Sequence, residues 1–161
     1  MSEETDKITE ITVSCPGEDG DEEFTMSRFA AMRCDVIQAH IEMIEEEQMQ
    51  AGVLPLSNIS ADLMPIIIEY LEEPYGEHQG GELTDFELGW VPEDPKELAP
   101  LIMAANFIDC QDMMETLTWH TANLMKGMTP EGLREMFGTP DDIPEDKKKI
   151  IHEQNKFLLE K

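Results

Sequence analysis

The residues that most often carry out chemistry in proteins are sparse in this chain and poorly placed for it. None of its four histidines pairs at the His-x-x-x-His spacing of a metal site; they stand at positions 40, 78, 120 and 152. Cys110 adjoins Asp109 but has no general base nearby, because ten residues of helix would place His120 about 15 Å away. The sequence therefore predicts no catalytic residue, no metal and no cofactor, and we do not expect an enzyme.

The cysteines and the N-terminal residues bear on the compartment in which the protein works. Cys15, Cys34 and Cys110 are odd in number and far apart, so they predict neither a disulfide framework nor a Cys-x-x-Cys zinc pair. Residues Met1–Asp6 are acidic and polar, unlike a secretory or mitochondrial leader. The sequence contains no run of about 18 apolar residues, so it predicts no membrane span. We therefore expect a reducing location, cytoplasmic and nuclear.

The formal net charge of the chain is −25 at pH 7, from 36 acidic residues and only 11 lysines and arginines. Nucleic-acid backbones and anionic membranes both attract basic surfaces, so the composition predicts neither as a partner. A basic protein partner is compatible with this charge, although acidity by itself indicates little more than solubility.

The first half of the chain predicts a small sheet followed by helices. Ile8–Val13 is rich in β-branched residues, and Glu22–Thr25 predicts a second short strand after a turn at Gly17–Gly20. Helical composition then runs from about residue 26 to 50, with Asp35 as a candidate N-cap.

Three further segments complete this half. Val53–Leu56 predicts an edge strand, because its proline has no N–H to donate to a central ladder. Ser60 is a candidate cap for the next helix, which would have Pro65 inside its first turns. Residues 72–96 combine prolines, glycines and acidic residues with few aliphatics, which predicts a flexible acidic loop. Helical segments follow, so the predicted fold class is α+β.

A helix predicted over Leu98–Asp109 carries apolar residues on two sides. At 100° per residue one stripe forms the expected core face; it consists of Leu98, Leu101, Ile102, Ala105 and Ile108. Phe107 projects from the opposite side with Met103 near it, and Asn106 lies between the two faces. Phe107 is either buried under a second layer of the same protein or an exposed aromatic anchor for a partner.

The next predicted helix, Gln111–Lys126, has the same two-sided character. Its core stripe consists of Met113, Leu117, Thr121 and Leu124, and Trp119 points away from it. An outward tryptophan is either covered by neighbouring side chains or placed at an interface, and the sequence leaves the role of Trp119 open.

Gly127 ends that helix, and the 34 residues that follow predict a helical extension with thin apolar content. Thr129 is the expected N-cap of a new helix with Pro130 at its first position. The last helix has one apolar face; it consists of Ile150, Ile151, Gln154, Phe157 and Leu158. Because the extension is too small for a core of its own, it packs either on the rest of the chain or on a partner.

Several blocks of this sequence resemble the Skp family of SCF ubiquitin-ligase adaptors. They keep the family's order and spacing over nearly the whole chain; the blocks are Val53–Ile59, Leu101–Asp109, Thr121–Gly127, Thr129–Arg134, Asp141–Ile143 and Glu153–Asn155. The resemblance implies a BTB/POZ fold, a small mixed sheet flanked by helices, over residues 1–127. It also implies that residues 128–161 are a C-terminal, F-box-binding helical extension.

The same resemblance implies a non-catalytic adaptor that bridges F-box substrate receptors to a cullin scaffold in an SCF (cullin-RING) E3 ubiquitin ligase. The implied cullin contacts are Asn106, Phe107 and Met103. The implied F-box contacts are Leu124, Leu133, Met136, Phe137, Ile143, Ile150, Ile151, Asn155 and Phe157. F-box proteins and a cullin are thus the expected partners, and a weak homodimer of the free protein is compatible with the resemblance.

The sequence departs from the family pattern at positions that bear on both implied interfaces. Phe107 replaces a tyrosine, and loss of a hydroxyl bonded to the cullin would cost about 1 kcal/mol. Phe157 replaces a tryptophan, and the family's Trp-Asp-x-x-Phe block survives only as Trp90 before Val91–Pro92. The helix around Arg33–Ile44 matches poorly. These differences are typical of a divergent paralogue with a restricted set of partners.

Other classes of binding protein are compatible with parts of the sequence. An adaptor of the elongin-C type is similar, but that family lacks an extension after Gly127. A self-associating BTB protein, or an acidic chaperone of basic proteins that does not bind cullin, would use the charge instead of the helices. Salt distinguishes these classes, because charges more than about 10 Å apart are screened at 0.1 M salt whereas apolar docking is not.

Overall fold

The computed structural model describes residues 8–47, 52–74 and 83–159. It divides the chain into two compact units, Met1–Leu124 and Met125–Lys161, which we call the body and the extension. The division falls close to the boundary after residue 127 that the sequence predicts.

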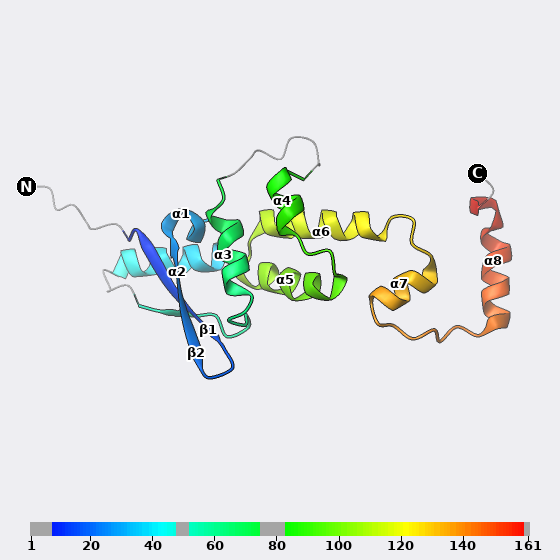
Figure 1. Ribbon diagram of the computed structural model, residues 1–161, viewed down its shortest axis with the longest axis horizontal. Helices are drawn as coiled ribbons and strands as arrows, with labels where there is room; N and C mark the ends of the chain where they lie inside the picture. Colours follow the sequence, from blue (N-terminus) through cyan, green and yellow to red (C-terminus); the bar gives the residue numbers. More distant parts are fainter. Residues whose placement is uncertain (1–7, 48–51, 75–82, 160–161) are drawn as a thin grey trace, which may run out of the picture. The chain divides into compact units, whose positions relative to one another are not determined.

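The body opens with a three-stranded mixed sheet (Figure 1). β1 (Glu10–Pro16) and β2 (Asp21–Ser27) pair antiparallel through a turn in which the Gly17 N–H donates to the Gly20 carbonyl at 2.9 Å. β3 (Leu54–Pro55) pairs parallel with the other side of β1, so the strand order is β2-β1-β3. The predicted hairpin and the predicted edge strand are both confirmed.

The helix predicted over residues 26–50 is instead two helices, α1 (Arg28–Ala31) and α2 (Asp35–Glu47). The first residues of the predicted helix belong to β2, because pairing with β1 outweighs their local preference. Asp35 is the first residue of α2 and not its cap. The carbonyl of the residue before it, Cys34, accepts the first helical hydrogen bond from Gln38 at 2.8 Å.

α3 (Met64–Glu72) begins later than the sequence predicts. Pro65 lies in its first turn, where a missing N–H leaves no helical hydrogen bond unmade. The prediction of Ser60 as the cap is therefore wrong, and the residue before the helix, Leu63, makes no side-chain capping bond.

The predicted flexible loop over residues 72–96 also needs correction, because its described part contains the helix α4 (Asp85–Trp90) and the start of the next helix. Thr84 and Glu87 form a capping box, in which each side chain bonds the other residue's backbone N–H. The indole N–H of Trp90 donates to the Ile66 carbonyl at 2.9 Å, which holds α4 against α3. The acidic residues at the helix start favour the helix, since they face its positive end.

Two long helices complete the body, α5 (Pro95–Ile108) and α6 (Gln111–Met125). Most of the predicted core stripe of α5 is buried, except that Ile102 is half-buried and Ala104 joins the core instead. In α6 the predicted core residues Met113 and Leu117 are buried. The α+β fold class is thereby confirmed for the body.

Tyr70 of α3 is the centre of a buried polar cluster that joins three helices. Its hydroxyl lies 3.0 Å from the Thr116 hydroxyl of α6, and Thr116 donates to the Glu87 carboxylate of α4 at 2.7 Å. Its ring packs 4.5 Å from the Trp90 ring, centre to centre. Burial raises the pKa of Tyr70 to about 12, so the hydroxyl keeps its proton at neutral pH.

Arg33, in the turn between α1 and α2, adds a fourth contact to this cluster. Its guanidinium lies over the Tyr70 ring at 5.1 Å and donates to the carbonyls that end α3, those of Tyr70, Leu71 and Glu73, at 2.8–3.1 Å. It also pairs with Asp112 of α6 at 3.6 Å. A cation at a helix C-terminus is favourable because it faces the negative end of the helix.

We expect Thr116→Val to lower the free energy of unfolding of the body by about 1–3 kcal/mol. The substitution keeps the shape of the side chain but leaves Tyr70 and Glu87 short of a hydrogen-bond partner in the core. Urea unfolding followed by circular dichroism measures the change. Thr118→Val, on the exposed side of the same helix, is the matched control, and an equal loss in both variants would contradict the expectation.

Candidate protein-binding surfaces

The outer face of α5 carries the three residues predicted to contact a cullin. Asn106 is exposed, and Met103 is 72% exposed. Phe107 is half-buried, with part of its ring packed on the core of the body. The structure thus lies between the two interpretations of Phe107, because the side chain packs on the body and is still partly exposed.

The C-terminal end of α5 is held by a left-handed turn. Asp109 adopts φ 52 and ψ 55, and its N–H bonds the carbonyls of Ala105 and Asn106. Its carbonyl accepts from the Asp35 N–H at 3.3 Å, so this turn is tied to the start of α2. The position of Asn106 and Phe107 therefore depends on a backbone conformation that few residues other than glycine, asparagine and aspartate adopt.

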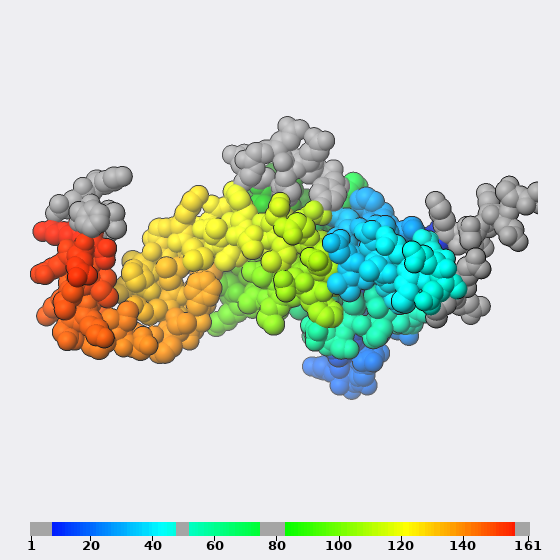
Figure 2. All heavy atoms as spheres, turned by 180° about the vertical axis from the view of Figure 1, so that it is seen from behind, coloured from blue at the N-terminus to red at the C-terminus, as the bar shows by residue number. Residues whose placement is uncertain are grey.

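The neighbouring helix α2 extends the candidate surface with residues that the sequence interpretation did not select. α2 contacts α5, and in the space-filling view the two helices lie next to each other (Figure 2). Val36 and Met43 of α2 are 38% and 44% exposed. Their signal in the sequence was the face of α2 opposite its buried residues Ile37, Ile41 and Ile44.

Cys34 and Cys110 are brought together where α2 and α6 begin, and both are fully buried. The Cys34 thiol donates to the Cys110 sulfur, which lowers the pKa of Cys110 to about 7 and raises the pKa of Cys34. Because neither sulfur is accessible, the pair is part of the core. Cys110 is thus the small buried residue that the sequence suggests.

α6 carries Trp119 and Leu124 near its C-terminal end. Trp119 is 38% exposed, so the structure leaves it partly covered. Leu124, a predicted F-box contact, is half-buried and packs on the core of the body.

The extension presents apolar side chains that are incompletely covered. α7 (Pro130–Met136) is capped by Thr129, whose hydroxyl accepts from the Gly132 N–H at 3.2 Å. Leu133 and Met136 are half-buried, and Phe137 is 57% exposed just after the helix. The predicted cap and helix start are confirmed.

The last helix, α8 (Glu145–Leu159), is exposed along the part whose side chains are described. Ile150 and Ile151 are 54% and 46% exposed, and Asn155 bonds back to the Ile151 carbonyl at 2.9 Å. Ile143, ahead of this helix, is half-buried. The predicted contact Phe157 lies in α8, but its side chain is outside the described part of the chain.

Charge is divided unevenly between the two units. Residues 125–161 hold seven of the 11 lysines and arginines and eight of the 36 acidic residues. The body holds the remaining four basic and 28 acidic residues. The extension is therefore nearly neutral, and almost all of the net negative charge belongs to the body.

Neither a metal centre nor a membrane span is found in the described residues. No group of three or more His, Cys, Asp or Glu side chains in this part of the chain is placed to hold a metal ion. No helix in the same part is long and apolar enough to cross a membrane.

Comparison with known proteins shows which family this chain resembles. The Skp1 family, dimerisation domain, matches residues 111–156. SKP1-like protein 9 of Arabidopsis thaliana is 26% identical over 141 residues, which cover 85% of this chain and 90% of that protein. SKP1-like protein 20 of Oryza sativa subsp. japonica is 26% identical over 184 aligned residues, which cover 99% of this chain and all of that protein.

A fungal relative extends the comparison beyond plants. Suppressor of kinetochore protein 1 of Schizosaccharomyces pombe is 22% identical over 149 residues, which cover 84% of this chain and 91% of that protein. These matches confirm the resemblance read from the sequence blocks. The chain is similar to SKP1-like proteins over most of its length, and its α+β fold is BTB-like.

We expect Asp109→Val to lower the free energy of unfolding by about 1–2 kcal/mol, because a β-branched side chain is strained at this positive φ. Asp109→Gly is the matched control, since glycine adopts the left-handed conformation without that strain. Urea unfolding compares the two variants. Equal stability of the valine and glycine variants would show that the left-handed turn is not a constraint on this end of α5.

Proposed function

We propose that the protein is a non-catalytic adaptor of an SCF-type ubiquitin ligase. In this proposal the extension binds the F-box of a substrate receptor and the outer face of α5 binds a cullin. Holding the two together raises the effective concentration of ubiquitin donor near the receptor's substrate. The cytosol and nucleus are the expected compartments for such an assembly.

The observation that carries the proposal is the exposed apolar surface of the extension. None of the described side chains of α7 and α8 is buried, although both helices carry large apolar residues. Apolar helical surface of this kind is stabilised when a partner removes it from water, at roughly 25 cal/mol per Å². The region matched by the Skp1 family includes α7 and most of α8.

The cullin interface has support of a different kind. Met103 and Asn106 are presented by α5 on the body, and Phe107 has its base packed in the core. An aromatic ring held by its own protein loses little conformational freedom on binding, which is typical of an interface hot spot. α2, which contacts α5, also exposes the apolar side chains Val36 and Met43.

We expect Phe137→Ala to weaken binding of a purified F-box fragment by about tenfold or more, because an exposed aromatic anchor is lost. Binding of a cullin N-terminal domain should be unchanged by this variant. Met103→Glu should weaken binding of the cullin domain and leave binding of the F-box fragment unchanged, since it places a charge in the proposed cullin contact. Isothermal titration calorimetry measures the affinity of each variant for each of the two fragments.

Leu88→Ala is the matched control for both variants, because Leu88 of α4 is 55% exposed and belongs to neither proposed surface. It should bind both partners like the wild type. Failure of the wild-type protein to bind either partner at moderate salt would overturn the adaptor proposal. Self-association or salt-sensitive binding of basic proteins would then be the better account of the chain.

A further inference from the structure

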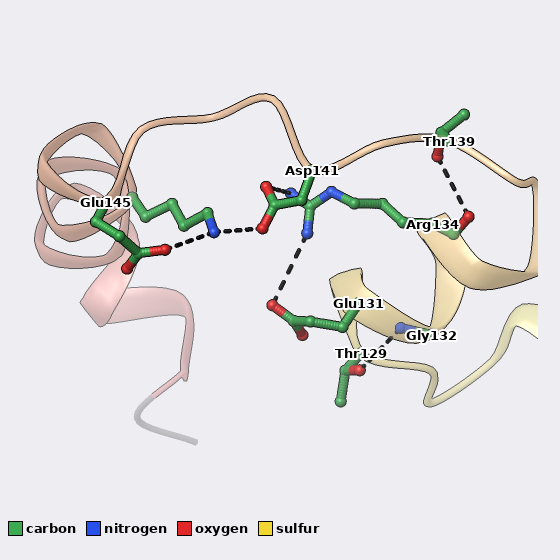
Figure 3. A network of polar contacts seen from close by, with 8 residues as sticks. Thr129, Glu131, Gly132, Arg134, Thr139, Asp141 and Glu145 are labelled. Atoms are coloured by element: carbon green, nitrogen blue, oxygen red, sulfur yellow. Dashed lines mark hydrogen bonds and ion pairs between the residues drawn. The ribbon is translucent and has the colours of Figure 1, made fainter.

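Asp141 lies on the segment between α7 and α8 and contacts both sides of it (Figure 3). Its carboxylate pairs with Arg134 of α7 at 3.7 Å and with the Lys148 ammonium of α8. One side chain thus joins the end of α7 and the start of α8.

The groups around Asp141 are themselves held in place. Arg134 also pairs with Glu131 at 3.8 Å, and its carbonyl accepts from the Thr139 N–H at 2.9 Å. Lys148 also bonds Glu145 at 2.7 Å. The side chains of Arg134 and Lys148 are only 22% and 29% exposed, so both cations are partly withdrawn from water. The contacts form a network of five charged groups centred on one carboxylate.

Charge pairs of this kind matter more here than on an ordinary surface. A single exposed ion pair contributes little to stability, whereas several charges in a network contribute more. Because no described side chain of α7 or α8 is buried, apolar packing fixes the relative orientation of the two helices less firmly than it would in a core. The lysine and arginine both keep their partners at neutral pH, since the pKa of Asp141 is lowered by its bond with Lys148.

We propose that Asp141 is a positioning residue, which holds α7 and α8 in the relative orientation that binds the receptor. The inference rests on the proposed function, because the receptor is taken to be an F-box segment. The carboxylate itself does not contact the receptor; it sets the angle at which the apolar residues Phe137, Ile150 and Ile151 are presented.

Asp141→Asn tests the role of the charge with little change in shape. The amide has the same size as the carboxylate, but both ion pairs are lost. Asp142→Asn is the matched control, since it removes the same charge from the adjacent exposed residue, whose side chain makes no hydrogen bond or ion pair within the described residues.

Orientation is measured first, without any receptor. Spin labels at Glu135→Cys on α7 and Glu153→Cys on α8 report the distance between the helices, and the three native cysteines are buried. We expect a narrow distance distribution in the wild type and with Asp142→Asn, and a broad one with Asp141→Asn. Equal distributions in the two variants would overturn the proposal.

Receptor binding is measured second, by calorimetry with a purified F-box fragment. We expect Asp141→Asn to weaken binding about fivefold relative to Asp142→Asn. Raising salt from about 0.05 to 0.5 M should weaken the wild type more than Asp141→Asn, because salt screens the network that the variant lacks. A purely folding role for Asp141 would not produce this difference in salt dependence.

The two measurements separate the two proposals. If the distance distribution broadens but affinity does not change, orientation does not govern binding and the positioning role is overturned. If the wild type does not bind the fragment, the F-box assignment fails, and the distance measurement alone decides whether Asp141 orients the helices.

Discussion

A buried carboxylate and the groups that satisfy it hold the body of this protein together. Glu87 is 5% exposed, and a carboxyl group so deep in a fold is tolerated only when it is hydrogen-bonded. Its bonds come from the start of α4 and from Thr116 of α6, and Thr116 in turn reaches Tyr70 of α3. Arg33 closes the cluster from the turn between α1 and α2. The positions of three helices and of the turn between α1 and α2 thus depend on one set of polar contacts. None of these contacts can be broken singly without leaving an unpaired group in the core.

The elements that the sequence predicts well are those with a simple local cause. The hairpin follows from β-branched residues around a glycine turn, and the helix after Thr129 follows from a capping residue and a proline. The predictions are wrong where a contact between residues far apart in the sequence determines the local structure. Residues 26 and 27 pair with β1 instead of joining a helix, and α4 is held by Trp90 bonding to Ile66. The capping box of Thr84 and Glu87 was a local signal for α4, but the surrounding glycines and acidic residues outweighed it in the prediction.

The candidate sites could be predicted only in part, for a related reason. A helical wheel separates the two faces of α5 correctly, because the helix is regular and its core stripe is well defined. It cannot determine how far Phe107 sinks into the body, since that depends on neighbouring helices. Selecting Val36 and Met43 as candidate surface residues requires knowing that α2 contacts α5. The periodicity of the sequence does not reveal that contact. The network around Asp141 joins residues seven apart on either side of a turn, so it too becomes visible only in three dimensions.

The uneven division of charge makes the electrostatic properties of the two units different. The body is strongly negative and the extension nearly neutral, so the two units present different potentials to an approaching protein. At low ionic strength two bodies repel each other before contact, whereas a partner that approaches the extension meets little repulsion. Long-range electrostatic repulsion would therefore make encounters between the bodies of two molecules less frequent than encounters of a partner with the extension.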